Sequence, residues 1–189
     1  HMGRPDLTAP ALDEEGFYRM GDAVRLVDAQ DATRGLQFAG RVAEDFKMAN
    51  GSWVQTGAVR LGLLERCNGL LSDAVVCGHD RNFIAALAWP NVTACRRLAP
   101  ELEGLDAAAL AEHPLVLERL RRHLAAQPPG TATQRVERLM LMAEPPAIDA
   151  NEIADKGYVN QAAVRTRRAA LVEALYEDAP APHAVCAAV

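Results

Sequence analysis

The sequence GRVAEDFK at residues 40–47 separates two segments with different patterns. Residues 17–38 combine alternating apolar residues with turn residues, which predicts a β-hairpin. Residues 48–177 alternate between strand and helix patterns, which predicts a compact α+β unit. A glycine followed by small and polar residues between two such units can absorb a backbone rotation. We therefore predict a hinge at residues 40–47.

The segment after the hinge contains short strands and amphipathic helices. Predicted strands cover residues 52–54, 74–77, 83–89 and the end of 136–142. Predicted helices begin near Thr56, Asn91 or Thr93, Asp106, Pro114 and Asn160. Together these elements predict a small sheet of about three strands flanked by helices. The Ala- and Pro-rich residues 178–189 predict a flexible tail.

Charge and composition argue against several classes of protein. The formal net charge of -5 argues against a nucleic-acid binder, which is usually basic. The four cysteines form no CxxC pair, so we expect free thiols in a reducing cytoplasm. No apolar run approaches the roughly 20 residues of a membrane-spanning helix. His113 and His123 have no partner at metal-ligand spacing, so we expect no metal site.

Two further motifs accompany residues 40–47, namely FYRMGD at residues 17–22 and DKGYVN at residues 155–160. In this order and at these separations, the three motifs resemble the C-terminal lid of acyl-adenylate-forming acid–CoA ligases. The variant is most similar to feruloyl-CoA synthase, and the resemblance covers nearly all of residues 17–177. It implies that residues 1–39 are a lead-in and a hairpin from the end of a large adenylating domain. Residues 48–177 would then be the lid domain.

The resemblance also concerns the extent of the chain. The helical stretch at residues 97–133 is longer than in the usual lid of this family, so we interpret it as an elaboration. His1-Met2 has the look of a recombinant start. We therefore expect this chain to be a fragment that is inactive alone, with no cofactor bound.

The resemblance assigns nucleotide contacts to residues near the hinge. Asp22 would accept hydrogen bonds from the ribose hydroxyls, since a carboxylate has free acceptor sites. Arg41 would bind the nucleotide through its guanidinium fork, and Lys47 would reach it from the lid. Gly51, in the Asn50-Gly51 turn, would let the pantetheine arm of coenzyme A approach, because glycine has no Cβ.

Lys156 is the catalytic residue that the resemblance implies. Adenylation builds negative charge on the α-phosphate and on the attacking carboxylate, and a mobile ammonium can stabilise both. The family usually has Asp or Lys two residues after the hinge arginine, where this chain has Ala43. We therefore place the hinge pivot at Ala43 and Glu44.

The implied reaction has two steps. A carboxylate and ATP with Mg²⁺ give an acyl-adenylate and pyrophosphate, and coenzyme A then forms the thioester and releases AMP. The expected partners are these small molecules, with a hydroxycinnamate as the acid. No nucleic acid and no membrane are expected as partners.

Two other functions fit the same sequence. The chain could be a non-catalytic α+β protein-binding module, in which case the order of the three motifs would be a coincidence. It could also belong to an adenylating domain that loads a carrier protein instead of coenzyme A. Taken singly, Asp22 could be a turn residue and Arg41, Lys47 and Lys156 could be solvated surface cations.

Overall fold

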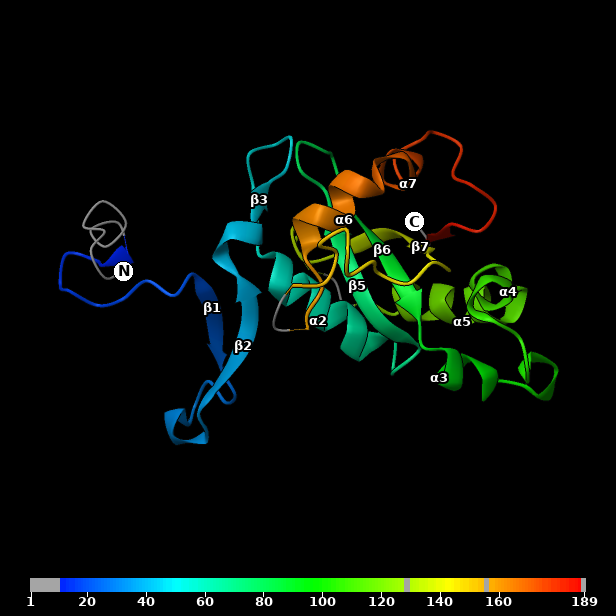
Figure 1. Cartoon of the computed structure of the whole chain (residues 1–189), viewed down its shortest axis with the longest axis horizontal. Helices are drawn as coiled ribbons and strands as arrows, with labels where there is room; N and C mark the ends of the chain where they lie inside the picture. Colours follow the sequence, from blue (N-terminus) through cyan, green and yellow to red (C-terminus); the bar gives the residue numbers. More distant parts are fainter. Residues whose placement is uncertain (1–10, 128–129, 155–156, 188–189) are drawn as a thin grey trace.

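The structure is a computed structural model and describes residues 11–127, 130–154 and 157–187. A hairpin projects from one end of the molecule, as Figure 1 shows. It consists of the antiparallel strands β1 (Asp22–Leu26) and β2 (Leu36–Arg41). Its turn includes a 3-10 helix at Ala32–Arg34, where the Asp31 carboxylate accepts a hydrogen bond from the Thr33 N–H. The predicted hairpin is confirmed, and its register places Asp22 opposite Arg41.

The hinge segment leads into a second, shorter hairpin. A 3-10 helix covers Val42–Glu44, and strands β3 (Phe46–Lys47) and β4 (Trp53–Val54) pair antiparallel. Helix α2 (Thr56–Arg66) follows directly. The helix begins at Thr56, as predicted, although the N-cap position is Gln55 and not Thr56, whose hydroxyl had suggested that role. The Thr56 N–H donates to Asp45 Oδ1, and the Thr56 hydroxyl donates to the Glu44 carbonyl, so α2 begins against the hinge.

The main sheet has four strands, in the order β5-β6-β7-β8. The strands are β5 (Leu71–Cys77), β6 (Ile84–Pro90), β7 (Val136–Leu141) and β8 (Val185–Cys186). The β6–β7 pair is parallel, and the pairs β5–β6 and β7–β8 are antiparallel. The fold is therefore α+β, as predicted, although about three strands were expected.

The fourth strand comes from the segment expected to be a flexible tail. Within residues 178–187, Val185 pairs with Leu139 of β7 and is fully buried. The Ala187 N–H donates to the Glu137 carbonyl at 2.8 Å. A two-residue strand is too short to produce an alternation pattern, and the surrounding alanines and prolines favoured disorder instead.

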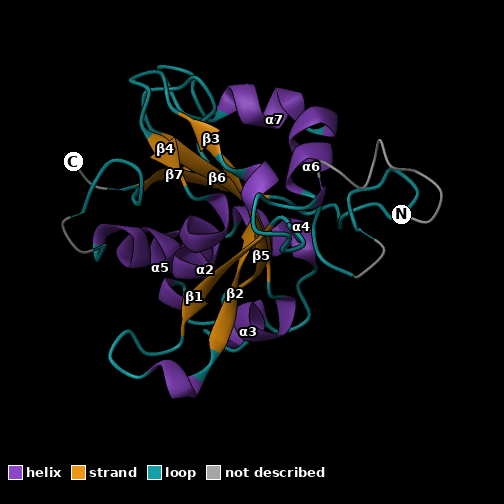
Figure 2. Cartoon of the chain, turned by 90° about the vertical axis from the view of Figure 1, so that its left-hand side faces the viewer, coloured by secondary structure: helices purple, strands orange, loops and turns teal. Residues whose placement is uncertain are grey.

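Helices cover both faces of the sheet. Between β6 and β7 lie α3 (Val92–Arg96), a 3-10 helix at Pro100–Leu102, α4 (Ala107–Glu112) and α5 (Pro114–Ala125). The last predicted helix is two helices, α6 (Gln161–Arg167) and α7 (Ala169–Ala174), which meet at Arg168. Figure 2 shows α6 and α7 together on one side of the strands, with α2, α3 and α5 on the other.

The side chains of the sheet divide between two hydrophobic clusters, as strand alternation requires. One cluster joins Ala86 and Leu139 to α2 and α5 through Leu63 and Leu120. The other joins the opposite face of the sheet to α6 and to Leu175, which follows α7. The strands β5, β6 and β7 therefore form the centre of the α+β unit that follows residue 47, and both faces of the sheet are covered.

The cysteines are free, as expected. Cys67, Cys77 and Cys95 are buried and Cys186 is half-buried. Burial raises the pKa of the Cys67 and Cys77 thiols to about 12, which keeps them protonated. Within the described ranges, no helix has both the length and the apolar character that crossing a membrane requires.

Candidate functional site

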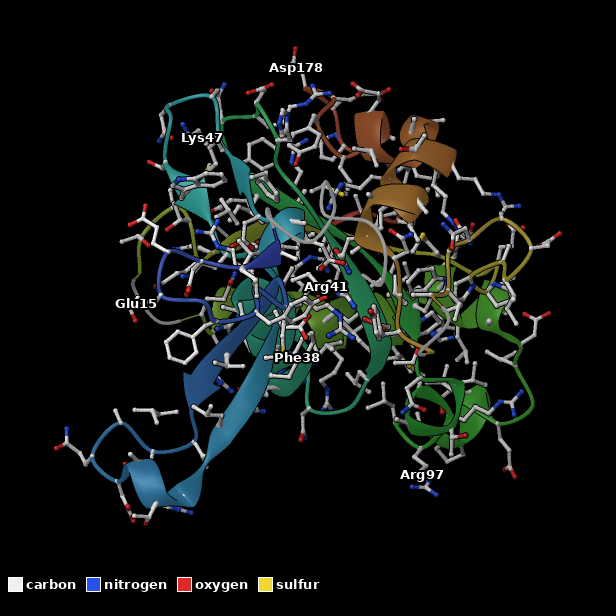
Figure 3. All side chains as sticks on the ribbon, turned by 60° about the vertical axis from the view of Figure 1, so that its left-hand side comes forward. Glu15, Phe38, Arg41, Lys47, Arg97 and Asp178 are labelled. Carbon is white, nitrogen blue, oxygen red and sulfur yellow. The ribbon has the colours of Figure 1, made fainter. Side chains whose placement is uncertain are left out.

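Arg41 lies at the end of β2, where the first hairpin meets the α+β unit that was predicted to be the lid, as Figure 3 shows. Its Nε is 3.5 Å from Asp22 Oδ1 across the β1–β2 pair. The preceding residue, Gly40, packs its backbone directly on α2. A Cβ built on Gly40 would lie 2.6 Å from the Gly57 Cα, and the φ of Gly40 is +113°. Glycine at both positions brings Asp22 and Arg41 close to the lid.

The third motif reaches the same place through Tyr158. Nη2 of Arg41 donates a hydrogen bond to the Tyr158 hydroxyl. The guanidinium also lies over the Tyr158 ring, with Cζ 5.4 Å from the ring centroid. Asp22, Arg41 and Tyr158 thus bring together three motifs that are far apart in the sequence. We did not single out Tyr158 from the sequence, although it lies in the motif that contains Lys156.

Two polar atoms of this cluster are buried without a hydrogen-bond partner, namely Asp22 Oδ1 and Arg41 Nε. Buried polar atoms are normally paired, so each such atom calls for an explanation. Here the acceptor and the donor face each other at 3.5 Å, where the first hairpin meets α2. A single hydroxyl group can donate to the first and accept from the second.

The predicted pivot residues lie beside the cluster. Ala43 and Glu44 belong to the 3-10 helix at Val42–Glu44, where Ala43 is exposed and Glu44 is half-buried. Burial raises the pKa of Glu44, although Arg165, Arg60 and Arg41 oppose that rise. The predicted hinge segment therefore contains a half-buried carboxyl whose ionised form is favoured by three nearby guanidiniums and disfavoured by burial.

Lys47 and Gly51 lie together in the β3–β4 hairpin, apart from Arg41 (Figure 3). The Lys47 ammonium lies over the Trp53 ring, with Nζ 5.4 Å from its centroid. Gly51 has φ +80°, and a Cβ there would meet no atom within 4 Å. Its N–H donates to the Met48 carbonyl, which confirms the predicted turn. The structure therefore does not bring Lys47 to the Asp22–Arg41 pair.

Lys156 and its neighbour Asp155 lie outside the described residues. The residues on either side form a narrow antiparallel connection. The Ala154 N–H donates to the Tyr158 carbonyl at 2.9 Å, and Ile153 pairs with Val159. The backbone that leads into and out of the Lys156 position is therefore tied to Tyr158.

A buried ion pair fixes the base of this connection. The Arg168 guanidinium donates two hydrogen bonds of 2.9 Å to the Glu152 carboxylate, whose side chain is fully buried. Arg168 also donates to the Glu144 and Pro145 carbonyls, and the Ala147 N–H donates to Glu152. The basic composition of residues 165–168 is typical of a solvated helix face, but Arg168 closes residues 144–152 against α6.

The described residues contain no group of three or more His, Cys, Asp or Glu side chains placed to hold a metal ion. The acids near the hinge do not form such a group, because Asp22 faces Arg41 and Asp45 accepts the Thr56 N–H.

No protein-family model matches the chain, and no curated protein matches it. Several solved structures do match the chain. The adenylation domain of a carboxylate reductase from Mycobacterium chelonae has a TM-score of 0.61 over 94% of this chain, at 21% identity. The adenylation domain of carboxylic acid reductase from Segniliparus rugosus, in complex with AMP and a co-purified carboxylic acid, has a TM-score of 0.60 over 92%, also at 21% identity.

The A-PCP didomain of the Segniliparus rugosus enzyme, in complex with AMP, gives a TM-score of 0.59 over 92% of this chain, at 21% identity. The chain spans 22% to 26% of the lengths of these three chains. It therefore has the fold of about a quarter of an adenylation domain.

Proposed function

We propose that this chain is the C-terminal lid portion of an AMP-forming acid–CoA ligase most similar to feruloyl-CoA synthase. One observation carries the proposal: the structure brings the three sequence motifs together in the Asp22–Arg41–Tyr158 cluster. A non-catalytic binding module would have no reason to gather these motifs at one point. The shared fold with adenylation domains, one of them solved with AMP and a carboxylic acid, supports the same conclusion.

The nucleotide would bind at the cluster. The unpartnered Asp22 Oδ1 would accept a hydrogen bond from a ribose hydroxyl, and Arg41 Nε would donate one to a ribose or phosphate oxygen. Lys47 would contact the nucleotide in one orientation of the lid. Mg²⁺ would accompany the phosphates of ATP.

Lys156 would act in the first step. The carboxylate oxygen of the acid attacks the α-phosphorus, the bond to pyrophosphate breaks, and an acyl-adenylate forms. The Lys156 ammonium would stabilise the charge that builds on the phosphate and carboxylate oxygens. We propose a hydroxycinnamate as the acid on the basis of the motif resemblance.

Coenzyme A would act in the second step. Its thiolate attacks the acyl carbon, the carbon–oxygen bond to AMP breaks, and the thioester forms. The open space at Gly51 would admit the pantetheine arm. The two lid orientations would interchange by rotation at Ala43 and Glu44.

The second candidate acceptor is a carrier protein. The observation that favours it is the shared fold with the A-PCP didomain of a carboxylic acid reductase. Offering coenzyme A and a phosphopantetheinylated carrier in parallel to the full-length protein separates the two. We expect transfer to coenzyme A, and transfer to the carrier alone would establish the second candidate.

The test of the first proposal uses the two lysines of the chain, Lys47 and Lys156. In the full-length protein, Lys156→Ala should slow ATP–pyrophosphate exchange about a hundredfold or more, since a preorganised charge contributes on the order of 3 kcal/mol. It should still convert supplied acyl-adenylate and coenzyme A to the thioester. Lys47→Ala should instead raise the KM for ATP and change kcat little.

Near-normal exchange in Lys156→Ala would refute the assignment, and so would equal loss of both steps in a folded variant. Lys156→Arg should also be slow, because the guanidinium fork is larger than an ammonium and differs in geometry.

A further inference from the structure

Tyr158 connects the lid to the first hairpin through both parts of its side chain. The hydroxyl accepts a hydrogen bond from Arg41 Nη2, and the ring lies against the guanidinium. Together these contacts fix one end and one face of the Arg41 fork. They leave Arg41 Nε and Asp22 Oδ1 buried, 3.5 Å apart and without a hydrogen bond.

We infer that Tyr158 is a positioning residue, which holds Arg41 ready for the nucleotide only while the lid presents the loop that contains Lys156. The inference rests on the proposed function, and it links nucleotide binding by Arg41 to the adenylation step of Lys156. Binding of the nucleotide by Arg41 and placement of the catalytic lysine would then depend on the same lid orientation.

The link follows from how firmly Tyr158 is tied to that loop. The Tyr158 carbonyl accepts the Ala154 N–H, and Val159 pairs with Ile153. The Asn160 N–H donates to the Glu152 carbonyl at 2.9 Å, so the buried ion pair with Arg168 also anchors this segment. The backbone of Tyr158 is therefore held together with the backbone on both sides of the Lys156 position.

The contact also depends on the orientation of the lid. Arg41 belongs to the hairpin and Tyr158 to the lid, with the proposed pivot between them. Other contacts between hairpin and lid are the packing of β2 on α2, which includes the Gly40–Gly57 backbone contact, and an exposed ion pair between Arg25 and Glu65 at 3.3 Å. An exposed pair contributes little, so of these two polar contacts the Tyr158 hydrogen bond should contribute more to the docking preference.

The chain provides a matched control. Tyr176 also lies against an arginine, with Arg81 Cζ 4.7 Å from its ring centroid, and its hydroxyl donates to the Phe83 carbonyl at 3.5 Å. All three residues belong to the lid. Tyr176→Phe therefore makes the same chemical change without touching the junction.

The first test uses this chain without any ligand. Spin labels at Gln30→Cys and Arg119→Cys, both exposed positions, report the distance between hairpin and lid in a Cys186→Ser background. Tyr158→Phe should lower the ratio of docked to undocked molecules about tenfold, because a hydrogen bond to a charged group is lost. Tyr158→Ala should lower it further, and Tyr176→Phe should leave it unchanged.

A distance distribution in Tyr158→Phe that equals the wild-type distribution would overturn the inference, provided that thermal unfolding shows the variant folded. So would an equal broadening in Tyr176→Phe. Because no ATP is present, neither result depends on the proposed activity.

The second test uses the full-length protein. Tyr158→Phe should slow ATP–pyrophosphate exchange about tenfold and leave thioester formation from supplied acyl-adenylate within about twofold. Equal slowing of both steps would count against a positioning role. If the wild-type protein forms no adenylate from any acid, the proposed function fails, and the distance measurement still decides the role of Tyr158.

Discussion

Replacing Glu152 by glutamine tests whether the buried ion pair holds the segment that leads to Lys156. The substitution keeps the size of the side chain and removes its charge, which leaves the Arg168 guanidinium buried without a counter-ion. In the folded chain the pKa of Glu152 is lowered from 4.5 to about 2, first by the hydrogen bonds from Arg168 and then by the Ala147 N–H and the charges of Arg168 and Arg167, against the opposing effect of burial.

The magnitude follows from this pKa. A difference of one pKa unit corresponds to about 1.4 kcal/mol, so the ionised Glu152 contributes on the order of 3 kcal/mol to the free energy of unfolding at pH 7. Removing one partner of a buried pair costs a similar amount, about 3 to 5 kcal/mol. We therefore expect Glu152→Gln to lower the free energy of unfolding by about 3 kcal/mol at neutral pH.

The stability difference between wild type and Glu152→Gln should also depend on pH. Because folding lowers the pKa of Glu152, the contribution of its ionised form to the free energy of unfolding is fully present above pH 4.5. That contribution is lost as the pH falls towards about 2. The difference between wild type and Glu152→Gln should therefore shrink to roughly half by pH 3. Urea unfolding followed by circular dichroism between pH 7 and pH 3 measures it.

The control is Glu173→Gln, which removes an exposed carboxylate that pairs with Arg81. An exposed pair contributes roughly 0 to 1 kcal/mol, so this variant should be nearly as stable as the wild type. A loss below about 1 kcal/mol in Glu152→Gln at pH 7, or a loss that stays constant down to pH 3, would contradict the role of the buried pair.

Further substitutions test the junction, the sheet edge and the pivot. Gly40→Ala should lower the free energy of unfolding by about 2 kcal/mol or more, because its Cβ would lie 2.6 Å from the Gly57 Cα. The control Gly35→Ala, at φ +89° with open space around it, should lower it by only about 1 kcal/mol through backbone strain. Equal losses in chemical unfolding would contradict the close contact at Gly40. Gln161→Leu should lower the free energy of unfolding by about 2 kcal/mol, because the Gln161 amide accepts a hydrogen bond from one main-chain group of β5 and donates to another, each at 2.9 Å. A loss below about 0.5 kcal/mol would show that water replaces the Gln161 amide. In the full-length protein, Ala43→Pro should slow one half-reaction far more than the other, since proline fixes φ, and equal slowing would place the pivot elsewhere.

The regular elements could be predicted where local chemistry decides them. Asn91, Asp106 and Asn160 each accept a hydrogen bond from the first turn of their helix, as N-cap residues do. The apolar runs in β5 and β6 follow from burial on both faces of the sheet. In all of these cases a short stretch contains the whole signal.

Contacts between distant residues could not be predicted in the same way. The basic residues at 165–168 have the composition of a solvated face, and only the fold shows that Arg168 closes on Glu152. Asp22 and Arg41 were expected near one ligand, but the sequence did not show that Tyr158 would join them. Lys47 carries a charge that suits a nucleotide, yet its ammonium lies over Trp53 in a different hairpin.

The two-residue strand β8 has a practical consequence for handling this protein. Trimming the chain after Glu177, where the sequence suggests that order ends, would remove Val185 from the core and leave β7 with an unpaired edge. An exposed strand edge pairs readily with the edge of another molecule. The shortened chain should therefore aggregate, and a tag fused at its C-terminus needs a spacer that leaves residues 184–187 free to pair.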